Sequence, residues 1–121
     1  MAMHIMENII NLYKDRVKDH DTFTIQVISE YLMDENGLEE KYFYDFHNKC
    51  TEVIALCDST ITFINEDRYD ELNKAYKVHE VHEILIRIIS YIEDEFKILL
   101  CKYEKYKIDH ESIYSGGNED E

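Results

Sequence analysis

The residues best suited to metal chemistry lie in the segment His79-Glu80-Val81-His82-Glu83, which places two imidazoles and two carboxylates within five positions. Imidazole nitrogens and carboxylate oxygens are common ligands of zinc and iron. The spacing matches neither the Glu-x-x-His pairs of di-iron bundles nor the His-Glu-x-x-His zinc signature. We therefore expect no cofactor, and a metal site at His79, His82 and Glu83 is only a weaker alternative to a surface histidine pair.

A second pair with chemical potential is His47 and Cys50, which lie three positions apart on an expected helix. Residues at this spacing are neighbours on a helix surface, where an imidazole can activate a thiolate. Cys50 also belongs to an apolar stripe with Phe46 and Val53, which is typical of a buried structural cysteine. Because no glycine-rich phosphate loop or nucleophile elbow accompanies the pair, we predict no catalytic residue and no enzyme activity.

Four aromatic residues and several carboxylates lie close together between Leu38 and Phe46. Aromatic side chains are enriched at the hot spots of protein interfaces. Helical geometry directs Phe43 and Phe46 towards the core and leaves Tyr44 on the surface. The candidate partner-binding residues are Glu35, Glu39, Glu40, Tyr44, Asp45 and Glu52.

The negative charge of the chain is unevenly distributed. Of the net charge of -14, residues 21–66 carry -8 and residues 108–121 carry -5, whereas residues 67–107 carry only -1. Opposite charge steers and accelerates protein association, so a basic protein surface is the expected partner. Lysines and tyrosines alternate in residues 102–107, a pattern found in nucleic-acid sites, but a chain of this charge repels phosphate. We therefore expect no direct binding of nucleic acid.

Together these features predict a non-enzymatic protein-binding module, an acidic inhibitor or regulator that docks on a basic surface of a partner such as a nucleic-acid-binding protein. The abundance of Ile, Lys, Tyr and Asn is typical of AT-rich genomes, including those of many phages, where such a protein would act against a host defence factor. The alternative within the same charge argument is a DNA mimic, whose carboxylates occupy the nucleic-acid groove of a nuclease.

Helices must position all these residues, because the chain has no proline and only three glycines. Apolar residues recur at spacings of three and four over residues 3–18, 23–34, 39–64 and 68–107. The fold class that follows is all-α, a small antiparallel bundle of four to five helices with one long C-terminal helix. Residues 22–28 also alternate in polarity, a pattern that fits a strand as well as a helix.

Three breaks are expected between these helices, one of them at Asn36-Gly37, which is either a cap between packed helices or the tip of a hairpin. His20-Asp21-Thr22 supplies capping side chains that end the first helix, and Asn65-Glu66-Asp67 ends the third. Asp67 and Asp70 then favour the start of the last helix through its dipole.

The apolar stripe of the long C-terminal helix changes phase along its length. Tyr69, Leu72 and Tyr76 fall roughly opposite the apolar residues of the later part of the helix. The apolar residues that share one side are Val78, Val81, Leu85, Ile88, Ile92, Phe96, Leu99, Tyr103 and Tyr106. The sequence therefore predicts either a bend near Lys77 or two halves that pack on different partners.

The same stripe spans ~42 Å, which is longer than the other helices readily cover, so a homodimer is expected. Residues 1–107 are expected to form a single helical domain, followed by a disordered acidic tail at 108–121. The three cysteines suit a reducing cytoplasm, and no stretch approaches the ~20 apolar residues of a membrane-spanning helix.

Overall fold

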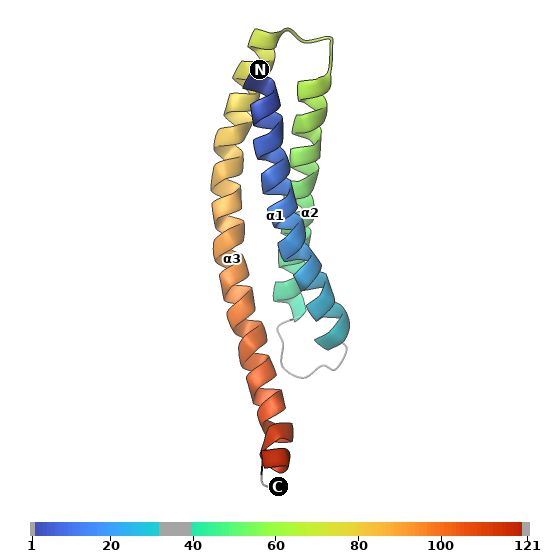
Figure 1. Ribbon diagram of the computed structural model, residues 1–121, viewed down its shortest axis with the longest axis vertical. Helices are drawn as coiled ribbons and strands as arrows, with labels where there is room; N and C mark the ends of the chain where they lie inside the picture. Colours follow the sequence, from blue (N-terminus) through green and yellow to red (C-terminus); the bar gives the residue numbers. More distant parts are fainter. Residues whose placement is uncertain (1, 32–39, 120–121) are drawn as a thin grey trace.

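Three helices make up the described part of the protein in a computed structural model. The structure describes residues 2–31 and 40–119, with side chains described for residues 3–30 and 41–109. The break expected at Asn36-Gly37 lies outside these residues. The helices are α1 (Ala2–Tyr31), α2 (Glu40–Asn65) and α3 (Glu71–Glu119) (Figure 1). Residues 22–28 are helical, and no strand occurs in the described residues. The all-α class is confirmed, but the expected four to five helices are three.

The helix count is lower because α1 runs through the break predicted at residues 20–22. Thr22 and Thr24 donate side-chain hydrogen bonds of 2.8 Å to the carbonyls of Lys18 and His20, four residues earlier, instead of capping a new helix. Asp21 is buried and bonds to His47 of α2. The polar groups that the sequence pattern assigned to a cap are therefore satisfied within α1 for Thr22 and by α2 for Asp21.

Contacts between side chains define an up-down-up arrangement (Figure 1). α1 and α2 are antiparallel, since Asp21 pairs with His47 and Lys14 pairs with Asp58. α3 runs parallel to α1 and antiparallel to α2. The pairs between α1 and α3 are Tyr13 with His82, His20 with Glu93, and Phe23 with Tyr103.

A seven-residue repeat of buried positions holds the bundle together. On α2 the buried side chains alternate at spacings of three and four, and on α1 and α3 buried side chains recur every seven residues, the pattern with which helices interlock in bundles. Polar members such as Thr24 and Thr60 satisfy their hydroxyls on carbonyls of their own helix. The hydrophobic core consists of Ile10, Val17 and Val27 of α1, Phe43, Phe46, Cys50, Val53, Cys57 and Ile64 of α2, and Val78, Leu85, Ile89, Ile92 and Leu99 of α3.

The turn between α2 and α3 follows the expected break after Asn65. The Asp70 carboxylate accepts a 2.8 Å hydrogen bond from the main-chain nitrogen of Asn73, which caps the start of α3. The predicted position of Asp70 at the start of the last helix is therefore confirmed, although α3 begins at Glu71 rather than at Arg68. Tyr69 precedes the helix, and its ring packs 4.8 Å from that of Phe63.

α3 passes through Lys77 without interruption, so no second helix begins there (Figure 1). The buried stripe extends back from Val78 to Lys74, which is 6% exposed. Leu72 and Tyr76 do not turn towards a second partner within the described bundle, since they remain 81% and 70% exposed. The apolar residues that lie out of phase with the stripe of α3, Leu72 and Tyr76, are therefore exposed on the surface.

None of the helices in the described part of the chain has the length and apolar character needed to cross a membrane. α3 extends through Glu119, and side chains after Asp109 lie outside the described set. The division into a domain at 1–107 and a separate acidic tail at 108–121 stays a prediction.

Two leucines of α3 test the core assignment. Leu85 is fully buried and Leu72 is 81% exposed. Leu85→Ala should lower the free energy of unfolding by about 2–5 kcal/mol because it leaves a cavity. Leu72→Ala should change it by less than about 0.5 kcal/mol. Urea denaturation followed by circular dichroism measures both, and equal losses would contradict the packing described.

Candidate protein-docking site

A groove runs along the surface between α2 and α3. Its hollows are lined by residues of these two helices, and neighbouring hollows share lining residues. Lys49, Glu52 and Tyr91 belong to the first two, and Leu56 belongs to the second and third. The groove therefore extends continuously from Tyr42 towards Phe63.

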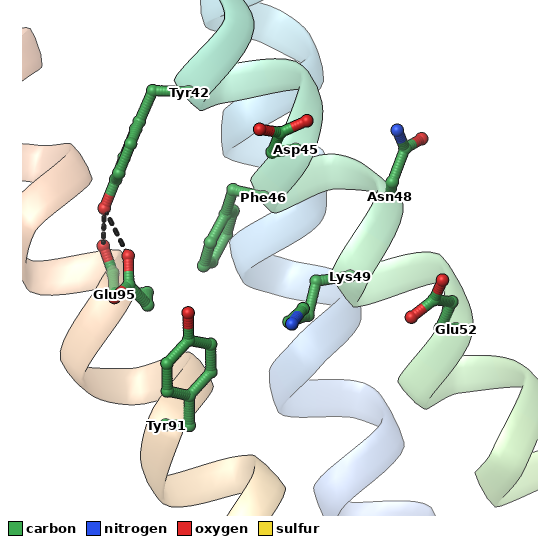
Figure 2. A pocket seen from close by; sticks show the side chains of 8 residues that line it. All are labelled: Tyr42, Asp45, Phe46, Asn48, Lys49, Glu52, Tyr91 and Glu95. Carbon is green, nitrogen blue, oxygen red and sulfur yellow. Dashed lines mark hydrogen bonds between the residues drawn. The ribbon is translucent and has the colours of Figure 1, made fainter.

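One end of the groove forms the hollow that we term the acidic cleft, with a volume of about 450 Å³. Figure 2 shows Tyr42 reaching across from α2 to α3, with Phe46, Lys49 and Tyr91 in the space between the helices. The residues of the acidic cleft are Tyr42, Asp45, Phe46, Asn48, Lys49, Glu52, Tyr91 and Glu95.

Hydrogen bonding and cation–π contacts organise this cleft. The Tyr42 hydroxyl donates to the Glu95 carboxylate at 2.6 Å and also lies 3.2 Å from the Glu95 carbonyl oxygen (Figure 2). The ammonium of Lys102 lies 5.1 Å from the centre of the Tyr42 ring. The ammonium of Lys49 lies 5.0 Å from the centre of the Tyr91 ring. Both tyrosine rings of the cleft therefore already face cations.

Carboxylates outnumber cations among the cleft residues, since Asp45, Glu52 and Glu95 face the single charge of Lys49. Within the described residues, no ion pair involves Asp45 or Glu52. By contrast, Asp58 on the other flank of α2 pairs with Lys14 of α1 at 2.5 Å. Exposed carboxylates beside aromatic rings suit a guanidinium or ammonium group, which bonds to oxygen and stacks on the ring.

The structure brings together only part of the predicted docking surface. Asp45 and Glu52 line the cleft, whereas Tyr44 is 43% exposed on a different flank of α2, since consecutive residues lie 100° apart on a helix. Glu35 and Glu39 lie outside the described residues. Glu40 begins α2, but its side chain is not described.

Sequence reasoning missed Lys49, Tyr91 and Glu95. Lys49 could have been predicted from the sequence, because it lies four residues after Asp45 and therefore on the same flank of α2. Tyr91 and Glu95 belong to α3, and placing them opposite Asp45 requires the register of the two helices. The inward positions predicted for Phe43 and Phe46 are confirmed.

The histidines of the metal alternative engage different partners. His82 shares a 2.9 Å hydrogen bond with the Tyr13 hydroxyl of α1, and the two rings stack. His79 lies 3.8 Å from Glu83 on the exposed side of α3. Among the side chains that the structure describes, no group of three His, Cys, Asp or Glu residues is arranged to hold a metal ion.

The His47 and Cys50 pair has no arrangement for nucleophilic chemistry. His47 Nδ1 lies 2.6 Å from Asp21 Oδ1, so the imidazole is engaged across the α1–α2 interface. Cys50 is fully buried. Burial, assisted by the nearby Asp21 charge, raises the pKa of the Cys50 thiol to about 12, and burial raises that of Cys57 to about 11. Both thiols are therefore protonated at neutral pH.

A polar cluster between α1 and α3 centres on Glu93. Its carboxylate accepts hydrogen bonds from Arg16 Nε and from His20, whose ring stacks on Phe96 with centres 3.9 Å apart. Burial of Glu93 opposes its ionisation, but the bonds from Arg16 and His20 outweigh this effect. They hold the pKa of the Glu93 carboxyl below its ordinary value of 4.5.

Comparison with protein-family models, with curated protein sequences and with solved structures found no match for this chain. Function is therefore inferred from the geometry and charge of the cleft.

Thiol labelling tests the burial of the cysteines. Cys101 is exposed, whereas Cys50 and Cys57 are buried with raised pKa values. Since the thiolate is the reactive form, a disulfide reagent at neutral pH should label one thiol per chain rapidly and all three only in urea. The Cys101→Ser variant serves as the control and should lose the rapid phase. Rapid labelling that persists in this variant would show a reactive buried cysteine.

Acid unfolding tests the Glu93 cluster. A carboxyl whose pKa is lower in the folded than in the unfolded state stabilises the fold above its unfolded pKa. The stabilisation from Glu93 should therefore be complete above pH 4.5 and be lost as the pH falls through the lowered folded value. Glu93→Gln should flatten this part of the stability curve, measured by urea titrations at several pH values. An unchanged pH dependence would contradict the assigned role of Glu93.

Proposed function

We propose that the protein is a non-enzymatic protein-binding module that docks the acidic cleft on a basic surface of a partner protein. The observation that carries this proposal is the position of Asp45 and Glu52, which line the cleft and make no ion pair within the described residues. Tyr91, which is half exposed, lines the same hollow from α3.

A cationic side chain of the partner meets three favourable features in this cleft. Carboxylates form hydrogen bonds with the cationic group, aromatic rings attract it through cation–π interactions, and partial burial strengthens both interactions. An arginine suits the site better than a lysine, because its planar guanidinium both stacks and forms paired hydrogen bonds. Its entry requires Lys49 to move off the Tyr91 ring.

The overall charge supports the same proposal. The whole chain has a net charge of -14. The described side chains, residues 3–30 and 41–109, include all 13 basic residues and 19 of the 27 acidic ones, so this part of the chain is also negative. Long-range attraction of a basic partner therefore adds to the local contacts in the cleft. The role we propose is that of a cytoplasmic inhibitor or regulator. In a phage setting its target would be a nucleic-acid-binding defence protein.

A DNA mimic remains the alternative function, supported by the net charge of -14. A mimic needs carboxylates along the surface that replaces the phosphate backbone. In the groove, Lys49, Arg87 and Lys77 interrupt the acidic residues. This distribution favours docking at one acidic end over occupation of an extended nucleic-acid groove.

The test is affinity capture from native host lysate at low and moderate salt, with bound proteins identified by mass spectrometry. The double variant Asp45→Asn/Glu52→Gln should weaken capture of the specific partner about tenfold, because two charged contacts are lost. The matched control is Asp15→Asn/Asp19→Asn, which removes the same charge from the exposed surface of α1.

Equal loss of capture in the control and in the cleft variant would contradict docking through the cleft. A partner that is released by competing DNA, with a steep dependence on salt, would instead favour the mimic.

A further inference from the structure

An exposed apolar stripe lies on the flank of α3 beside the groove. Ile84, Tyr91 and Ile98 are 50%, 49% and 47% exposed. Their spacing of seven residues places them on one side of the helix, one above another. Leu56 and Ile88 line the adjoining hollow of the groove and extend this apolar surface. Large apolar side chains repeated on one exposed flank are typical of interaction surfaces.

We propose that the occupant is a second copy of this chain, whose α3 packs antiparallel on the stripe with the two-fold axis at Tyr91. The stripe is symmetric about this residue, since Ile84 precedes it by seven positions and Ile98 follows it by seven. An antiparallel copy therefore places each Ile84 against the other chain's Ile98, and the tyrosines meet at the axis. The same patch faces itself, as a two-fold dimer requires.

The charges beside the stripe fit the same axis. Arg87 lies four residues before Tyr91 and Glu95 lies four residues after it, so each Arg87 faces Glu95 of the second copy. Glu80 and Lys102, each eleven residues from the axis, form a second complementary pair. A parallel copy in register places Arg87 against Arg87 and Glu95 against Glu95, which repel. Charge complementarity therefore selects the antiparallel arrangement.

Two observations show that Arg87 and Glu95 are each able to pair with the second copy. No ion pair within the described residues involves Arg87, which lines the groove next to Tyr91. Glu95 accepts a hydrogen bond from Tyr42, which holds its carboxylate in the cleft and leaves lone pairs for a guanidinium. Arg87 of the second copy then supplies a cation to the cleft.

Self-association follows from the stripe and its charges and does not depend on the proposed docking on a basic partner. The two occupants use the same cleft, because both bring a cation to Glu95. A basic partner and a second copy therefore exclude one another, and the dimer conceals the docking site.

Charge-swap variants test the register, with the dimer dissociation constant measured by analytical ultracentrifugation. Arg87→Glu should weaken the dimer at least tenfold, because Glu95 then faces a carboxylate in both halves of the interface. The double variant Arg87→Glu/Glu95→Arg should restore most of the affinity, and circular dichroism checks that each variant is folded. Lys97→Glu makes the same charge change off the stripe and should leave the dimer intact. A wild-type chain that stays monomeric up to millimolar concentration, or a double variant weaker than Arg87→Glu, would overturn the proposal.

Disulfide formation across the axis provides a second test that does not involve Glu95. In a Cys101→Ser background, Tyr91→Cys should yield a covalent dimer under mild oxidation, because a residue at a two-fold axis faces its own copy. Lys97→Cys should remain monomeric, and equal cross-linking of the two variants would overturn the assigned axis. Neither result bears on Asp45 and Glu52 in the lysate experiment, so failure of the dimer is distinguishable from failure of the proposed function.

Discussion

The seven-residue repeat of buried side chains on all three helices is the constraint on which the rest of this structure depends. It directs one face of each helix inwards and determines which flanks remain outside. Residues such as Phe43 and Leu85 are fully buried because they occupy the centre of this face. The groove between α2 and α3 exists because no further helix among the described residues covers the flanking positions of these two helices.

Polar pairs between helices then fix the register that the apolar repeat alone leaves ambiguous. Asp21 with His47 aligns α1 with α2, and Glu93 with His20 aligns α1 with α3. Tyr42 with Glu95 aligns α2 with α3 and also shapes the acidic cleft. Partly buried pairs of this kind contribute little net stability, but sliding a helix by one turn leaves their charges unpaired. Register and binding site therefore depend on the same contacts.

Periodicity in the sequence was sufficient to predict the helical class, the long α2 and the break after Asn65. It failed at residues 20–22, where Asp21 and Thr22 resemble capping residues and yet lie inside α1. The reason is tertiary, since His47 lies 26 residues further along the chain and supplies the partner that the pattern cannot reveal. Leu72 and Tyr76, which lie opposite the apolar stripe in the sequence pattern, are exposed on an uninterrupted α3.

The site was predictable only where it lies on one helix. Asp45 and Glu52 lie on α2 and were selected because they belong to the acid-rich stretch at residues 21–66. Tyr91 and Glu95 complete the cleft from α3, and their position depends on how α2 and α3 align. Tyr44 was selected for its exposure, which is confirmed, although helical rotation carries it away from the cleft. Candidate residues on a single helix can thus be selected from the sequence. Which side chains of two different helices come together can be known only once the fold is known.

The central claim is that binding takes place in the cleft between α2 and α3. Titration of the isotopically labelled, dilute protein with an arginine-rich peptide, followed by amide NMR shifts, tests it most directly. The account predicts shifts confined to residues 42–52 and 84–98, which saturate and persist at moderate salt. Shifts that spread evenly over exposed carboxylates, including Asp15 and Asp19 of α1, and vanish with salt would contradict a built site and leave only the general attraction of an acidic surface.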